Sequence, residues 1–261
     1  MIDCHCHLAD EEFANDIDEV IDRAKQSGVT GAIVVAEFAS DFDRVLQLSE
    51  MYQGFLFPCL GLHPVQRNFE SVNVTAHYES MDIEKKIRQE SHRLCGIGEV
   101  GLDFTPRYLK NGDDDKTNQR EVFRRQIKLA NEFDLPVNVH SRSAGKPTID
   151  FLIENCATKV LLHAFSGNVK SARPGIEHGF HFSVPPSFTI STDKKDLIEA
   201  IPTKQLCLET DSPVLGPSRD QRNEPKNVEL SAKFIAEVKK LTVEDVIRIT
   251  TANAKNLFKL L

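Results

Sequence analysis

Four histidines and two acidic residues stand at or near the ends of short apolar runs: His5, His7, Glu99, His140, His163 and Asp211. Imidazole nitrogens combined with carboxylate oxygens are typical of sites for Zn, Mn, Co or Fe, and are richer in nitrogen than most Mg or Ca sites. One catalytic zinc ion usually takes three protein ligands. Six candidates therefore predict two ions that share a carboxylate.

His5 and His7 are separated by a single residue in the first apolar run. Side chains alternate between the two faces of a strand, so both imidazoles are expected on one face, about 7 Å apart along the backbone. Cys4 and Cys6 are then expected to face the helices as buried free thiols. A zinc finger is not indicated, because no second pair of metal-binding residues follows at the required spacing.

Eight short runs rich in β-forming residues predict strands, and most of them are nearly continuous in apolar residues, as expected for a parallel sheet covered on both faces. The predicted strands are 2–7, 31–36, 55–60, 94–100, 135–140, 159–164, 179–184 and 205–210. Segments with helical spacing of apolar residues separate them, at 16–27, 42–52, 82–92, 117–133, 148–155, 169–178 and 194–200.

The repeat from His5 to Asp211 is about 29 residues per unit, close to the length of one strand and its helix. Eight such units predict an α/β protein with a (β/α)8 TIM-type barrel, and a doubly wound open sheet is the alternative. The tail from Val228 supplies the last helices, with a capping box at Thr242 that starts the final one. No linker divides the chain, so residues 1–261 are expected to form one domain.

Loops that follow the strands hold the active site of such a barrel. The long segments 61–81 and 212–227 are therefore expected near the site, whereas the polar segment 110–118 is expected to be a solvated loop that caps the next helix. His77, His92 and His178 lie in polar surroundings and are expected on the surface.

Composition excludes several classes of protein. The longest apolar runs are far shorter than the roughly 18 to 20 residues that span a bilayer, and no export signal opens the chain, so a soluble protein without a membrane partner is expected. Six scattered cysteines suit a reducing compartment, cytoplasm or nucleus. A net charge of −7 argues against bulk attraction to nucleic acid, and nothing indicates an obligate protein partner.

Seven short blocks resemble, in order and over nearly the whole chain, the motifs of TatD-type metal-dependent deoxyribonucleases. They lie at residues 5–8, 61–64, 98–104, 140–142, 163–167, 209–213 and 222–225. Residues 137–144 and 222–228 look most like the eukaryotic branch called TatD domain-containing protein 3. The blocks are individually modest, but their order makes the resemblance specific.

The resemblance implies a metallo-dependent hydrolase barrel that cleaves DNA phosphodiester bonds, as an exonuclease or at abasic sites. Two divalent ions (Zn, Mn, Co or Mg) would be held there, the first by His5, His7, Glu99 and Asp211 and the second by Glu99, His140 and His163. Glu99 would bridge them. Asp211 would take the proton of the attacking water, and Asp211 and Glu99 are the expected catalytic residues.

Further residues have two interpretations each. His63 contacts substrate phosphate or organises its loop, and Arg142 binds phosphate or forms a structural ion pair. Asp103 and Glu209 are expected to support ligand histidines by hydrogen bonds. Ser143 stands where many relatives have aspartate. Lys146, Arg107 and Arg222 are expected on loops at the barrel mouth.

Two other functions remain open. One is a different barrel metallohydrolase, acting on phosphomonoester, lactone or amide bonds. The other is a non-enzymatic scaffold that binds metal or DNA.

Overall fold

The computed structural model describes residues 1–67, 73–75, 82–191, 193–218 and 220–260. Eight parallel strands form one sheet in the order of the chain, without a switch point. They are β1 (Ile2–Cys6), β2 (Gly31–Val35), β3 (Leu56–Leu60), β6 (Gly96–Gly101), β7 (Val137–His140), β8 (Val160–Leu162), β9 (His181–Val184) and β10 (Leu206–Leu208). This confirms the predicted barrel and excludes the doubly wound sheet, in which the strand order reverses.

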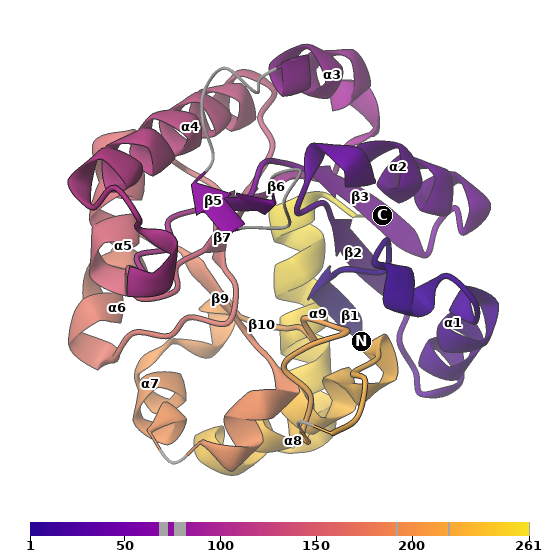
Figure 1. The fold of residues 1–261 in the computed structure, drawn as a ribbon. Coiled ribbons are helices and arrows are strands. Elements are labelled where there is room, and N and C mark those ends of the chain that lie inside the picture. Colours follow the sequence, from indigo (N-terminus) through magenta and orange to yellow (C-terminus); the bar gives the residue numbers. More distant parts are fainter. Residues whose placement is uncertain (68–72, 76–81, 192, 219, 261) are drawn as a thin grey trace.

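Helices alternate with the strands and surround them (Figure 1). They are α1 (Ile17–Gln26), α2 (Phe42–Met51), α3 (Asp82–Glu90), α4 (Asp113–Glu132), α5 (Gly145–Glu154), α6 (Val169–Glu177), α7 (Lys194–Ala200), α8 (Val228–Lys239) and α9 (Val243–Phe258). Short 3-10 helices occur at Glu11–Phe13, Ala39–Asp41, Ser91–Arg93, Pro106–Tyr108, Pro186–Ile190, Thr203–Gln205 and Pro225–Asn227.

The predicted elements agree with these bounds to within a few residues, with two differences of kind. The segment 110–118 is not a loop throughout, because α4 begins at Asp113 and carries Asp113, Asp114 and Asp115 in its first turn, where carboxylates interact favourably with the helix dipole. Segment 61–81 contains the antiparallel pair β4 (Val65–Arg67) and β5 (Asn73–Thr75), which was not predicted.

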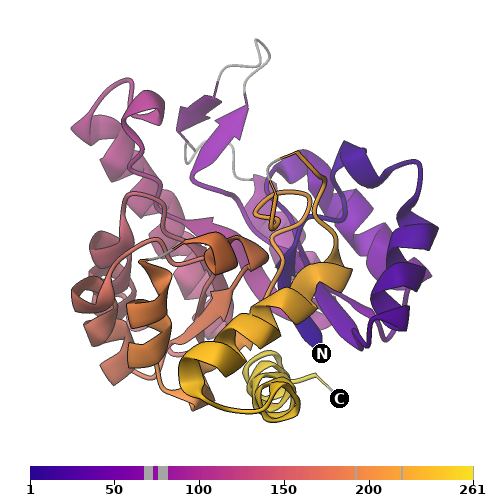
Figure 2. The ribbon, with the colours of Figure 1, turned by 90° about the horizontal axis from the view of Figure 1, so that it is seen from below.

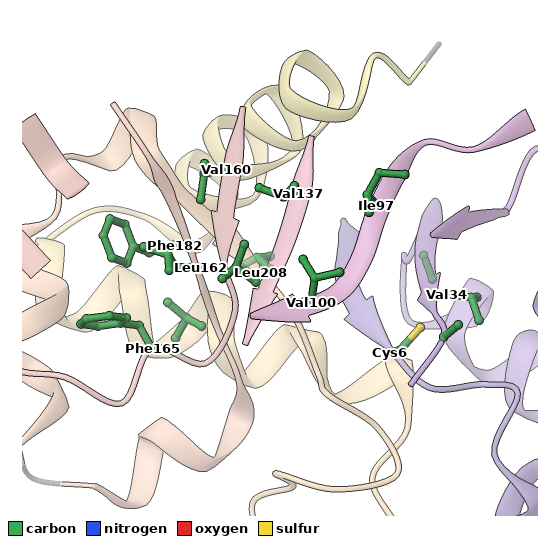
Figure 3. Close-up of a cluster of buried hydrophobic side chains, with 14 of the residues drawn as sticks. Cys6, Val34, Ile97, Val100, Val137, Val160, Leu162, Phe165, Phe182 and Leu208 are labelled. Atoms are coloured by element: carbon green, nitrogen blue, oxygen red, sulfur yellow. The ribbon is translucent and has the colours of Figure 1, made fainter. Parts of the chain in front are cut away.

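Two buried clusters lie on opposite faces of the sheet, because neighbouring residues of one strand belong to different clusters. The larger lies between the strands and the surrounding helices, and Figure 3 shows part of it, with Val34, Val100, Leu162 and Phe182 from separate elements. The smaller joins Ile33, Cys59 and Cys207 to Leu257 and Phe258 of α9. Figure 2 shows α9 at the end of the barrel opposite β4 and β5.

Cys4 differs from its prediction. It packs in the smaller cluster with Cys207, whereas Cys6 packs in the larger one. The register of β1 against β2 shifts between Asp3 and Cys6, and such an irregularity turns consecutive side chains to the same face. Both thiols are nevertheless buried and free, as expected.

The seam between β1 and β10 is closed by few backbone bonds, from Asp211 to His5 and from His7 to Ser212. The buried carboxylate of Asp3 adds to them by accepting from the backbone and hydroxyl of Thr210 at 2.9 and 2.6 Å. No helix in the described part of the chain is long and apolar enough to cross a bilayer.

Candidate metal centre

The six candidate ligands converge at the carboxyl ends of the strands. His5 and Glu99 lie within β1 and β6, His140 ends β7, and the other three follow β1, β8 and β10. Each is buried except His7, whose side chain is 15% exposed. A cavity of about 360 Å³ opens in front of them and is lined by five of the six, together with His63, Asp103 and Arg142.

The first cluster is formed by His5, His7, Glu99 and Asp211. The Nε2 atoms of the two histidines are 3.2 Å apart, and Oδ1 of Asp211 lies 3.4 and 3.2 Å from them. Oε2 of Glu99 lies 3.7 Å from His5 Nε2 and 3.4 Å from His7 Nε2. A tetrahedral ion with bonds of about 2.1 Å has ligand atoms about 3.4 Å apart. The four residues are therefore spaced as ligands of one ion.

The second cluster surrounds the other oxygen of Glu99. Oε1 lies 2.7 Å from Nδ1 of His140, 2.8 Å from Nε2 of His163 and 3.7 Å from Nε2 of His63. His63 thus lies beside this cluster, whereas contact with substrate phosphate and organisation of its loop were the two roles expected for it. Its Nδ1 lies 3.1 Å from the backbone nitrogen of Val65, so the same ring also organises its loop.

Two buried polar atoms of the centre have no hydrogen-bond partner within the described part of the chain: Oδ1 of Asp211 and Nδ1 of His163. Buried polar atoms are rarely unsatisfied. Oδ1 of Asp211 is also the atom that faces both histidines of the first cluster. The unsatisfied oxygen and the mixed nitrogen and oxygen donors fit a divalent metal ion.

Electrostatics point the same way. Burial lowers the pKa of His63 and His163 to about 4. At His7 the effect of burial is outweighed by Asp211 and Glu99, which raise its pKa to about 10. The pKa values of Glu99 and Asp211 fall despite burial, because histidines surround both carboxylates. Buried anions require cations beside them, and divalent ions would supply this charge in place of the imidazole protons.

The two predicted supporting residues differ in role. Oδ2 of Asp103 lies 3.2 Å from Nε2 of His140, as expected for a carboxylate that orients a ligand. Glu209 accepts from the backbone nitrogen of Ala164 at 2.8 Å and lies 3.9 Å from Nδ1 of His163. Glu209 therefore chiefly holds the turn that carries His163.

Most of the arginines and lysines that were predicted at the barrel mouth contact other residues of the chain. Arg222 pairs with Asp16 and Glu224 and stacks on Phe13, and Lys146 pairs with Asp150. Arg107 stacks on the ring of Tyr108. Arg142 is exposed and lines the cavity. Ser143 is exposed with φ of 55°, and its hydroxyl lies 3.4 Å from that of Thr105.

Of the three histidines predicted on the surface, His92 and His178 are exposed as expected, and His77 lies outside the described residues.

The sequence did not predict the residues that form hydrogen bonds to the candidate ligands or to the backbone beside them. Oδ1 of Asn138 lies 2.8 Å from Nδ1 of His5, and Gln126 of α4 holds both the nitrogen and the carbonyl of Leu62, beside His63. Gln119, two turns earlier in α4, holds the backbone of Asp103 in the same way. The one available signal was a polar residue, Asn138, two positions before His140 in an apolar strand.

Comparison with known proteins adds an independent result. Residues 2–259 match the family described as TatD related DNase. The human protein named Deoxyribonuclease TATDN3 is 48% identical over 99% of this chain and 94% of its own length. A Bacillus subtilis protein named as an uncharacterized metal-dependent hydrolase, YabD, is 35% identical over 100% of this chain and 99% of its own. The crystal structure of the Escherichia coli TatD homologue YjjV superposes with a TM-score of 0.86 and 29% identity, covering 100% of this chain and 98% of that one. The chain therefore belongs to the TatD related DNase family of hydrolytic enzymes.

Proposed function

We propose that this protein hydrolyses phosphodiester bonds of DNA at a centre of two divalent ions. His5, His7, Glu99 and Asp211 hold the first ion, and Glu99, His140 and His163 hold the second. His63 lies close enough to the second cluster to contribute a further nitrogen.

The orientation of Glu99 carries this proposal. The two oxygens of its carboxylate face different clusters. Oε2 faces His5 and His7, and Oε1 faces His140 and His163. A carboxylate that supports a single ion has no need of a second buried histidine cluster on its other oxygen. The arrangement favours a bridging ligand.

Bound divalent ions polarise phosphoryl oxygens, lower the pKa of a coordinated water and stabilise the leaving oxygen. Asp211 is placed to accept the proton of that water, because its carboxylate lines the cavity and the surrounding histidines keep it ionised. Its backbone has φ of 56°, a conformation that non-glycine residues adopt mostly where the surroundings impose it. Glu99 stays anionic and fixes the separation of the two clusters.

DNA as the substrate is proposed from the name of the human relative and from the family to which the chain belongs. The rim carries Asp10, Glu12 and Glu37, so a polyanion is held by the ions and by few local cations. Binding should therefore weaken only modestly with salt, with log affinity falling at a slope of about one to three against log salt.

The test combines metal analysis with digestion. The purified protein is analysed for metals, reconstituted with Zn, Mn, Co or Mg, and incubated with end-labelled single-stranded, double-stranded and abasic-site DNA. Phosphomonoester, lactone and amide substrates are assayed in parallel. If the protein turned over one of these three substrates but not DNA, the alternative function as another barrel metallohydrolase would be favoured over DNA cleavage. Metal binding without turnover of any substrate would favour a scaffold. A cytoplasmic or nuclear location is part of the proposal and is tested by imaging a tagged protein.

A further inference from the structure

Lys194 is a buried cation that has no buried counterion among the residues described by the structure. It is 8% exposed, and it is the one buried residue among the lysines and arginines whose side chains the structure describes. Its Nζ donates to the carbonyls of Phe165 and Ser166 at 3.4 and 3.2 Å and lies 5.0 Å from the ring centre of Phe188. These partners are neutral. Buried lysines are ordinarily paired with an anion.

The carboxylate nearby compensates this charge poorly. Oδ2 of Asp193 lies 3.9 Å from Nζ of Lys194, and the Asp193 side chain is 74% exposed. Exposed ion pairs at such distances contribute little. Burial lowers the pKa of Lys194, which reflects the same lack of compensation.

A second cavity, of about 180 Å³, gives an anion access to the ammonium of Lys194. It is lined by Lys194 and by Arg142, together with the hydroxyl-bearing residues Ser141, Ser166 and Ser187. His140, His163 and Asp211 line both this cavity and the one in front of the metal centre. The second cavity is therefore a side arm of the first, at the carboxyl ends of β7 to β10.

We propose that Lys194 and Arg142 form an anion subsite for the DNA phosphodiester adjacent to the one that is cleaved. This inference rests on the proposed function. The cleaved phosphate would lie at the two clusters, and the next phosphate along the strand would enter the side arm. There the ammonium and guanidinium donate charge-assisted hydrogen bonds to its non-bridging oxygens.

A phosphodiester of DNA fits this site. It carries one negative charge and two acceptor oxygens, which match one ammonium and one guanidinium. Asp211 also faces the side arm, but its charge is directed to the first cluster. An extended strand offers repeated phosphates, so cleavage at one linkage places a neighbour within reach of a second cation site.

Three variants and a set of modified substrates test the subsite. Lys194→Met removes the charge and keeps most of the side-chain length, Lys194→Arg restores a cation, and Lys195→Met is the matched control. Lys195 is the next residue of α7, is 55% exposed and pairs with Glu237. The probes are single-stranded hexanucleotides in which one linkage at a time is a neutral methylphosphonate. Binding is measured by fluorescence anisotropy in EDTA, and hydrolysis is measured with metal.

The subsite predicts that Lys194→Met weakens binding of the unmodified hexanucleotide about tenfold or more and raises KM by a similar factor, with kcat nearly unchanged. Lys194→Arg recovers most of the loss, and Lys195→Met changes nothing. With wild-type protein, one methylphosphonate position reproduces the loss. With Lys194→Met, that position has no further effect, because the contact is already absent.

A different result is that Lys194→Met weakens binding by the same factor whichever linkage carries the methylphosphonate. That result would overturn the subsite and make Lys194 a structural residue. If Lys194→Met does not fold, the methylphosphonate scan of the wild-type protein in EDTA tests the proposal instead. The proposal would be overturned if no single neutral linkage weakened binding. Binding in EDTA involves no chemistry, so absence of hydrolysis by the metal-loaded wild type would defeat the proposed function alone.

Discussion

Oδ1 of Asn138 accepts a hydrogen bond from Nδ1 of His5 at 2.8 Å and joins β7 to β1 across the barrel. The amide nitrogen of Asn138 also donates to the carbonyl of Cys4 at 2.9 Å. Both bonds are buried. With Nδ1 engaged in this way, Nε2 of His5 is left to face Asp211 and Glu99, which is the tautomer that binds a metal.

Asn138→Leu should therefore weaken binding at the first cluster by about 10- to 100-fold, the range seen when a residue that orients a metal ligand is lost. Titration of the metal-free protein with Zn²⁺ against a competing chelator measures this. Asn138→Asp keeps an acceptor for His5 and should lose less. Equal affinity in wild type and Asn138→Leu would show that β1 alone orients His5.

Glu99→Ala should disturb both ions, because the two oxygens of this carboxylate face different clusters. His163→Ala removes a ligand of the second cluster only and should leave the first ion bound. Elemental analysis of the purified variants gives the stoichiometry. Full two-ion occupancy in Glu99→Ala would contradict the bridging assignment.

Asp211→Asn is expected to fold normally and to lose at least about 10² to 10⁴ in turnover, as for removal of a positioned acid or base. The amide can still lie against His5 and His7 but cannot take a proton. Rates on DNA are compared with circular dichroism and metal content of the same sample. Retained turnover with metal bound would transfer the base role to Glu209 or Asp103.

Gln126→Leu should destabilise the protein by about 2 kcal/mol or more, because it leaves the buried nitrogen and carbonyl of Leu62 without partners. Urea unfolding measures the change. The control is Gln47→Leu on the exposed face of α2, which should change stability by less than about 0.5 kcal/mol. Equal effects of the two substitutions would show that α4 does not hold the His63 loop.

Removal of metal should lower the melting temperature. An ion that binds only the folded state contributes about 2.7 kcal/mol when its concentration is 100 times its Kd. Thermal unfolding in excess EDTA and after return of the metal should show a reversible shift. The shift should be smaller in Glu99→Ala, and an equal shift in that variant would place the stabilising metal elsewhere on the chain.

The apolar runs and their spacing along the chain were enough to predict the eight strands, the order of the units and the positions of the six candidate ligands. Apolar runs of strand length, separated by amphipathic segments of helix length, encode alternating strands and helices locally, but this pattern is shared by a closed barrel and a doubly wound open sheet. Each ligand lies in, at the end of or just after such a run, so its approximate place at the carboxyl end of the barrel required no knowledge of long-range contacts. The same local signal was ambiguous around Asp113, because acidic residues suit both a loop and the first turn of a helix.

The contacts between individual side chains could not be predicted and are seen in the three-dimensional fold. The pairing of β1 with β2 shifts register between Asp3 and Cys6, and Cys4 and Cys6 pack in different clusters, whereas strand alternation alone predicts that they share one face. The contact of Asn138 with His5 and that of Gln126 with Leu62 join positions 133 and 64 residues apart. Lys194 is buried because Phe165 and Ser166, which follow β8, and the ring of Phe188 lie against it. Hydrogen bonds between distant segments depend on packing, which leaves no periodic pattern along the chain.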